Sequence, residues 1–156
     1  MIDTPTPTNH SLPLKSSGYR SLAEALDYAA QGETGCNFYN GRGELTASMT
    51  YADLRRKALN LAARLNSLGL KRGSRIALVA DTHPGFHSMF FACQYAGLVP
   101  VPVPAAVHLG GKQAFVEHLR ALLIDCEAQA AYASEQFVAF LDEAVEGLNL
   151  AASGTL

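Results

Sequence analysis

The chain has 156 residues, of which 12 are Lys or Arg, 14 are Asp or Glu, and 49% are hydrophobic. This length suits a single domain, and this composition favours a packed core over a disordered chain. The formal net charge of −2 gives no electrostatic basis for binding nucleic acid or an anionic membrane surface, so neither partner is expected.

The cysteine pattern and the N-terminus predict a cytoplasmic protein. Cys36, Cys93 and Cys126 form no C-x-x-C pair, which argues against a disulfide framework or a zinc ribbon. The first residues lack the basic segment and apolar run of a secretory signal. Residues 82–111 contain no charged Asp, Glu, Lys or Arg. Prolines interrupt that stretch, so we expect a buried helix and a buried strand there and no transmembrane segment.

The first part of the chain predicts a tail, a helix and a hairpin. Residues 1–18 are rich in Thr, Pro, Asn and Ser and are expected to form a flexible tail. Ser21 and Glu24 have the spacing of a capping box, which predicts a short helix from this point. The turn sequence NGRG at 40–43 predicts a β-hairpin. This hairpin either extends the main sheet or pairs with material outside the chain.

A second helix is predicted by leucines at helical spacing. Thr50 is its expected N-cap, and Gly69 is placed to end it. Arg55 and its basic neighbours lie off the apolar stripe, where such a face is usually solvated. The inward residues are Leu54, Ala58, Leu61, Leu65 and Leu68.

The rest of the chain alternates between apolar strands and amphipathic helices. This order predicts a parallel sheet of three strands, joined by right-handed crossovers and covered by helices on both faces. The predicted fold class is therefore α/β, with an N-terminal β-hairpin. Ser134 is expected to cap the last helix, and 151–156 is expected to be a tail. The predicted strands are 75–80, 98–101 and 129–133, and the predicted helices are 84–96, 111–126 and 135–148.

No group of side chains predicts a catalytic or metal centre. His83 and His87 would share a helix face, but they lack the acidic residue of H-E-x-x-H and a third ligand. The segment Gly110-Gly111-Lys112 lacks the upstream glycine and the Ser or Thr of a phosphate loop. Asp81 follows a predicted core strand, where open α/β sheets bind ligands, but a single acid there is more commonly a polar residue at a helix start. Cys93 and Cys126 lie on apolar stripes and are expected to be inert core thiols.

Four segments, in order, resemble the start of an adenylate-forming enzyme, the superfamily of acyl-CoA synthetases, luciferases and peptide-synthetase adenylation domains. Residues 50–54 (TYADL) resemble its T-Y-x-E-L helix start, and 69–78 (GLKRGSRIAL) resemble its G-x-x-x-G-D strand entry, with Ser74 in place of Asp. Residues 90–102 (FFACQYAGLVPVP) resemble its helix–Gly–strand segment, and 119–133 the helix and strand that follow. The alternating Val and Pro after Gly97 resemble the fatty-acyl-AMP ligase branch.

The resemblance covers 19–150 and implies the N-terminal subdomain of a ligase with two reaction steps. In this family a carboxylate attacks the α-phosphate of Mg-ATP, and the acyl group of the adenylate then passes to a thiol of CoA or of a carrier protein. The resemblance implies ATP and Mg²⁺ for the full-length enzyme and no cofactor for this fragment. It implies as partners a fatty acid, an acyl carrier protein or CoA, and the remainder of the ligase chain.

The family's phosphate loop, magnesium ligand, ribose-binding Asp and late catalytic Lys are expected beyond Leu156. We therefore assign no catalytic, cofactor-binding or metal residue, and we expect the fragment alone to be inactive and able to self-associate. The alternative is a stand-alone binding or scaffold module derived from such a ligase. An unrelated dinucleotide-binding domain is disfavoured, because no Gly-rich turn follows Ala80.

Overall fold

The computed structural model describes residues 12–105 and 111–156, in which helices and strands alternate as the sequence predicts. Each predicted helix and strand is present within a few residues of its expected bounds, and one strand at the C-terminal end was not predicted. The elements are α1 (Leu22–Ala29), β1 (Gly35–Tyr39), β2 (Leu45–Thr50), α2 (Tyr51–Asn66), β3 (Arg75–Ala80), α3 (Pro84–Ala96), β4 (Val99–Pro104), α4 (Gly111–Asp125), β5 (Ala130–Ala133), α5 (Val138–Val145) and β6 (Ala152–Thr155).

Four parallel strands form the main sheet, in the order β4-β3-β5-β6. The parallel sheet is as predicted, but it has a fourth strand. The expectation of a tail without secondary structure over 151–156 is therefore wrong, because Ala152–Thr155 form β6. Strand β6 was missed because its sequence, ASGT, has neither an apolar alternation nor a run of β-branched residues. The strand forms because it pairs with β5, a contact that its own sequence does not indicate.

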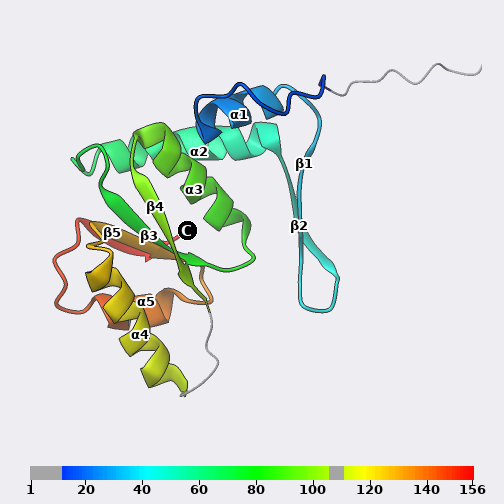
Figure 1. Ribbon diagram of the computed structural model, residues 1–156. Helices are drawn as coiled ribbons and strands as arrows, with labels where there is room; N and C mark the ends of the chain where they lie inside the picture. Colours follow the sequence, from blue (N-terminus) through cyan, green and yellow to red (C-terminus); the bar gives the residue numbers. More distant parts are fainter. Residues whose placement is uncertain (1–11, 106–110) are drawn as a thin grey trace, which may run out of the picture.

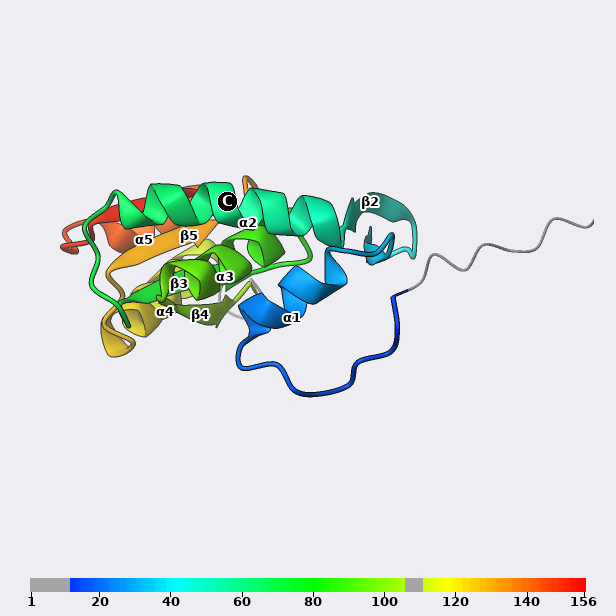
Figure 2. The same ribbon diagram turned by 90° about the horizontal axis from the view of Figure 1, so that it is seen from above.

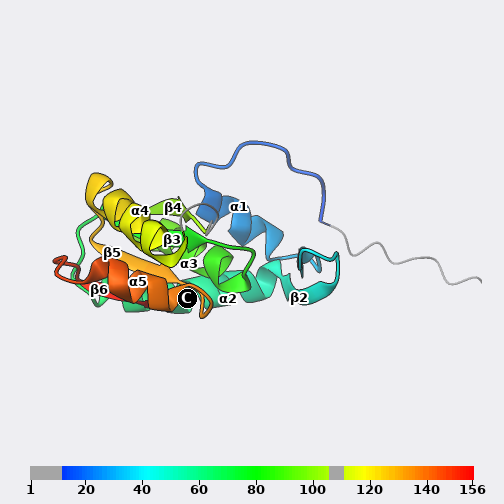
Figure 3. The same cartoon turned by 90° about the horizontal axis from the view of Figure 1, so that it is seen from below.

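Helices cover both faces of this sheet, as predicted. Helices α2 and α3 lie on one face, and α4 and α5 lie on the other (Figures 1 and 3). The side chains buried on the α2–α3 face include Leu65, Ile76, Leu78, Met89 and Cys93. Those buried on the α4–α5 face include Val79, Phe115, Leu119, Leu123 and Leu141.

The hairpin forms a two-stranded antiparallel sheet of its own. Figures 1 and 2 show it standing apart from the main sheet, beyond one end of α2. The expectation that it could extend the main sheet is therefore wrong. The hairpin is held through Phe38 and Met49, which form a small core with Leu26 of α1 and Leu54 of α2.

Three predicted helix caps, at Ser21, Thr50 and Gly97, are present, and the predicted end of α2 differs. The Ser21 hydroxyl accepts the Glu24 N–H at 3.1 Å, and the Thr50 hydroxyl accepts the Asp53 N–H at 3.0 Å. Gly97 ends α3 with φ +70°, in the left-handed region that glycine favours. Helix α2, however, ends before Gly69, because its C-cap is Ser67.

Part of the predicted N-terminal tail, 1–18, falls outside the described residues. Over 12–18 the chain forms no helix or strand, but it contacts α1. The Tyr28 hydroxyl donates to the Pro13 carbonyl at 2.6 Å, and the Lys15 ammonium lies 5.5 Å from the centre of the Tyr28 ring. Within the ranges that the structure covers, no helix has both the length and the apolar character that a membrane span requires.

Candidate functional site

The carboxyl ends of β3 and β5 lie side by side at the place where open α/β sheets bind ligands. The chain leaves β3 towards α3 on one face of the sheet and leaves β5 towards α5 on the other face. Neighbouring strands whose connections diverge in this way open a crevice between the two loops. Asp81 follows β3 and Ser134 follows β5, so the fold places these two polar residues at the crevice.

The Ser134 hydroxyl donates a hydrogen bond to the Asp81 carboxylate. Ser134 is only 2% exposed. The second carboxylate oxygen, Asp81 Oδ1, is buried and has no hydrogen-bond partner among the described residues. Both residues had been predicted to act at helix starts, and both predictions are wrong: His83 is the N-cap of α3, and Phe137 is the N-cap of α5. The Asp81–Ser134 contact spans 53 positions, so no local pattern could reveal it.

A hollow of about 590 Å³ lies beside this pair, between the carboxyl edge of the sheet and the hairpin. Among the described residues, its lining contains amide, hydroxyl and carboxylate groups but no Lys, Arg or His side chain. A carboxylate without a neighbouring cation disfavours a phosphate group at this position. The lining residues are Tyr39, Asn40, Gly41, Thr46, Ala80, Asp81, Thr82, Ala105, Gln136 and Phe137.

The two histidines considered as metal ligands have separate environments. The His83 Nδ1 atom accepts the Gly85 N–H at 3.1 Å, as a helix cap does. The His87 ring lies edge-on to Phe38 and Phe86, with ring centres 5.2 Å and 5.6 Å away. Across 12–105 and 111–156, no three His, Cys, Asp or Glu side chains are grouped as a metal site requires.

The segment Gly110-Gly111-Lys112, considered as a phosphate loop, leads into α4, and Lys112 links α4 to α5. Gly110 lies outside the described residues, and Gly111 begins α4 with φ +78°. The Lys112 ammonium lies 2.5 Å from the Glu143 carboxylate of α5. Lys112 therefore forms an exposed ion pair between two helices, a contact of the kind that usually contributes less than about 1 kcal/mol.

Two of the three cysteines, Cys93 and Cys126, lie in environments that suppress thiolate formation. Cys93 is fully buried, and this burial raises the pKa of its thiol to about 12. Partial burial also raises the pKa of the Cys126 thiol. Both agree with the prediction of inert core thiols, although Cys126 is only partly buried. Cys36 lies beside Tyr51, whose pKa is raised by the negative charge that the Cys36 thiolate would carry and by partial burial.

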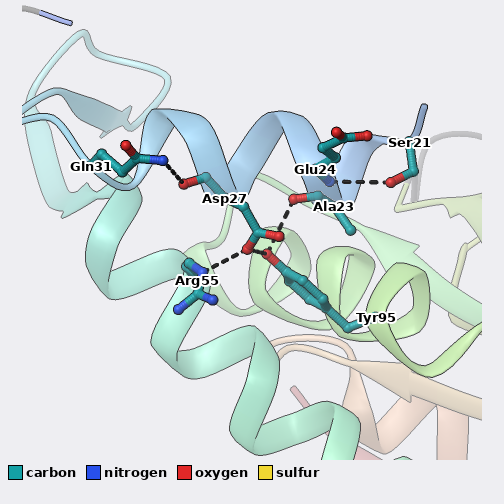
Figure 4. Close-up of polar contacts among 7 residues, drawn as sticks. All are labelled: Ser21, Ala23, Glu24, Asp27, Gln31, Arg55 and Tyr95. Carbon is teal, nitrogen blue, oxygen red and sulfur yellow. Dashed lines mark hydrogen bonds and ion pairs between the residues drawn. The ribbon is translucent and has the colours of Figure 1, made fainter. Parts of the chain in front are cut away.

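A polar network missed at the sequence level joins α1, α2 and α3. Figure 4 shows Asp27 of α1 between Arg55 of α2 and Tyr95 of α3. The Asp27 carboxylate accepts hydrogen bonds from the Tyr95 hydroxyl at 2.7 Å and from the Arg55 Nε–H at 2.6 Å. Arg55 had been expected to lie on a solvated face. Partial burial of the Asp27 carboxylate opposes its ionisation, but these two bonds outweigh burial and lower the pKa of Asp27 below its usual value.

Replacing Asp27 by asparagine is expected to lower the free energy of unfolding at neutral pH by about 1 kcal/mol. Hydrogen bonds to a charged group contribute about 1.5–3 kcal/mol, and the contribution is discounted here because Asp27 and Arg55 are 44% and 43% exposed. Since the folded-state pKa is lowered, this stabilisation is present above the unfolded-state pKa and is lost as the pH falls through the folded-state pKa. Urea unfolding at several pH values measures it.

The control for this prediction is Asp125→Asn, which changes an exposed carboxylate at the end of α4. This variant should unfold at the wild-type urea concentration. An Asp27→Asn variant as stable as wild type at neutral pH would show that the network contributes nothing to stability.

Comparison with known proteins identifies the family. The model of the family described as "AMP-binding enzyme" matches residues 28–153. A "Putative acyl-CoA synthetase" of Caulobacter vibrioides (strain NA1000 / CB15N) is 44% identical over 123 residues, which cover 79% of this chain and 22% of that protein. A "4-hydroxybenzoate--CoA/benzoate--CoA ligase" of Rhodopseudomonas palustris is 30% identical over 118 residues, or 72% of this chain and 21% of that protein.

Solved structures agree with this assignment. A structure from a study of fatty acyl-adenylate ligases of E. coli and L. pneumophila superposes with a TM-score of 0.80 at 36% identity, covering 87% of this chain and 25% of that one. A benzoate CoA ligase from Burkholderia xenovorans LB400 gives a TM-score of 0.63 at 27% identity, covering 86% and 25%. The chain thus spans about a fifth to a quarter of these relatives. On its sequence and its fold, the chain belongs to the AMP-binding enzyme family.

Proposed function

We propose that these residues form the N-terminal part of a ligase that activates a fatty acid with ATP and passes the acyl group to a thiol of a carrier protein or of CoA. The observation that carries this proposal is the likeness, at 36% identity and a TM-score of 0.80, to a structure from a study of fatty acyl-adenylate ligases. The 44% identity to the Caulobacter protein, whose name describes an acyl-CoA synthetase, supports the same chemistry.

The described residues do not fit Mg-ATP by themselves. The hollow at the carboxyl edge of the sheet presents the Asp81 carboxylate and no cation, whereas adenylation needs positive charge around the phosphates. No group of acidic side chains in the described ranges is arranged to hold a metal ion. We therefore propose that the rest of the ligase supplies the groups that hold ATP and Mg²⁺, and that this fragment is inactive alone.

The proposal also covers the cellular location of the ligase, the main partner of this fragment and its self-association. We propose the cytoplasm as the location of the ligase, because the proposed reaction uses ATP, a fatty acid, and CoA or a carrier protein. The proposed main partner of this fragment is the remainder of the same ligase. Exposed apolar side chains, among them Tyr39 and Leu45 at 50% and 57% exposure, support weak self-association when that remainder is absent.

Acyl adenylate formation tests the substrate class. A chimera in which residues 1–156 replace the matching part of the Caulobacter relative should form a fatty acyl adenylate from ATP and a long-chain fatty acid, detected by mass spectrometry. Adding CoA or a carrier protein with its phosphopantetheine arm then identifies the thiol acceptor. Benzoate is the matched control substrate, because other relatives are benzoate ligases. A chimera that forms benzoyl adenylate and no fatty acyl adenylate would contradict the proposed substrate.

A further inference from the structure

One hydrogen-bond acceptor at the carboxyl edge of the sheet has no donor. The Asp81 Oδ1 atom is buried, and no described residue donates to it. The other carboxylate oxygen, Oδ2, accepts from the Ser134 hydroxyl, and Ser134 is held in the core at 2% exposure. This bond fixes the orientation of the carboxylate. Because a buried carboxylate oxygen without a donor is costly, we expect a further group to bind to Oδ1.

The polar side chains that line the adjacent hollow from the hairpin side are directed to the hairpin itself. The Asn40 amide donates to the Glu44 carboxylate at 2.6 Å. The Thr46 hydroxyl donates to the Phe38 carbonyl at 3.0 Å. Neither donor therefore serves Asp81, although both side chains line the same hollow.

The lining of the hollow indicates the chemical class of the missing group. At about 590 Å³, the hollow has the size of a site for a small organic molecule. Over the part of the chain that the structure describes, it is lined by the Asp81 carboxylate and by no Lys, Arg or His side chain. Two aromatic rings also line it, Tyr39 of the hairpin and Phe137 at the start of α5.

A carboxylate beside aromatic rings favours a cation that carries N–H groups. Such a cation forms a charge-assisted hydrogen bond to a carboxylate, which is stronger than a bond from a neutral donor, and it is attracted to the face of an aromatic ring. A metal ion fits less well, because no three possible ligand side chains are grouped within 12–105 and 111–156.

We propose that this hollow is a binding site for an organic cation, an ammonium or guanidinium group that donates to Asp81 Oδ1 and lies against the Tyr39 ring. Two sources can supply this chemistry: a free amine, or a Lys or Arg side chain of the ligase outside residues 1–156. The site does not depend on the proposed adenylation chemistry, because every residue that forms it is among those described.

An NMR titration of the 156-residue chain with propylammonium chloride tests the site. Propionamide, a neutral molecule of similar size, is the matched control, and KCl keeps the ionic strength constant. Propylammonium should produce saturating shifts of the Asp81, Thr82, Ser134 and Gln136 amides, and propionamide should not. Equal responses to the two molecules, or shifts that do not saturate with propylammonium, would overturn the proposal.

The carboxylate is tested by Asp81→Asn, which keeps the shape of the side chain and removes its charge. This variant should bind propylammonium about 10-fold more weakly or worse, as expected for the loss of a hydrogen bond to a charged group. Asp125→Asn changes an exposed carboxylate at the end of α4 and should bind with wild-type affinity. Equal affinities of the two variants would overturn the role of Asp81.

The aromatic ring is tested by Tyr39→Leu, which alters an exposed position of the hairpin and leaves the core intact. Loss of the ring should weaken propylammonium binding by about 2- to 5-fold. Leu45 pairs with Tyr39 across the hairpin but does not line the hollow, so Leu45→Ala should bind as wild type does. Equal effects of the two substitutions would overturn the contact with the ring.

The chimera with the Caulobacter relative distinguishes the two sources of the cation. If the chimera binds propylammonium as the isolated chain does, the ligand is a free amine. If it does not bind propylammonium, and Asp81→Asn lowers its melting temperature more than that of the isolated chain, a basic side chain of the ligase occupies the site. A chimera that shows neither behaviour would overturn the proposal. Failure of the chimera to form an adenylate would contradict the proposed function alone, because the titration of the 156-residue chain involves no adenylation.

Discussion

Replacing Leu78 by alanine is expected to lower the free energy of unfolding by about 3 kcal/mol, in the middle of the range for buried leucines. Leu78 is fully buried in β3, which has β4 on one side and β5 on the other. Its side chain packs in the core beneath α2 and α3. Because strands and helices enclose this position, the neighbours can collapse only partly into the space that the substitution leaves.

Chemical denaturation of the Leu78→Ala variant measures this effect, with Leu59→Ala as its control. Leu59 is 37% exposed on α2, so its truncation should cost well under about 1 kcal/mol. A loss at Leu78 no larger than the loss at Leu59 would contradict the packing described for the central strand.

Replacing Gly35 by alanine should detach or distort the start of the hairpin and lower stability by about 2 kcal/mol, as overpacking of a tight site does. A methyl group at this position would lie 2.2 Å from the Met49 carbonyl oxygen and 2.7 Å from the Thr50 Cα. Both neighbours are backbone atoms, which cannot turn aside as a flexible side chain could. The displacement would reach Met49, which anchors the hairpin to α1 and α2.

Gly41→Ala is the matched control, because a methyl group on Gly41 would meet nothing within 4 Å. This glycine lies at the turn of the same hairpin. Thermal unfolding should place the Gly41→Ala variant near wild type and the Gly35→Ala variant clearly below it. Equal melting temperatures for the two variants would show that the close approach at Gly35 is not a constraint on the fold.

The elements that could be predicted are those with a local signal. The capping oxygens of Ser21 and Thr50, the proline at the start of α3 and the glycine at its end all act within one turn of helix. The continuous apolar run of β3 predicts a strand covered on both faces, and the structure shows it covered by helices on each side. These signals determined the α/β architecture without tertiary information.

The elements that were mispredicted depend on contacts distant in the sequence. Strand β6 is defined by its pairing with β5 rather than by its own residues. The Ser134 hydroxyl is directed to Asp81 rather than to a helix end, and Arg55 reaches Asp27 across 28 positions. Ser134 and Arg55 each had an equally good local role, as a helix cap and as a solvated side chain. Only the packing of the elements decided between that local role and the distant contact.

ATP–pyrophosphate exchange with a long-chain fatty acid most directly tests the claim that these residues are one part of an acyl-adenylating ligase. The account predicts no exchange by the 156-residue chain alone, because its described residues gather neither cations nor metal ligands at the carboxyl edge of the sheet. It predicts fatty-acid-dependent exchange by the chimera with the Caulobacter relative. Exchange by the isolated chain would contradict the account, and so would a folded chimera that shows no exchange.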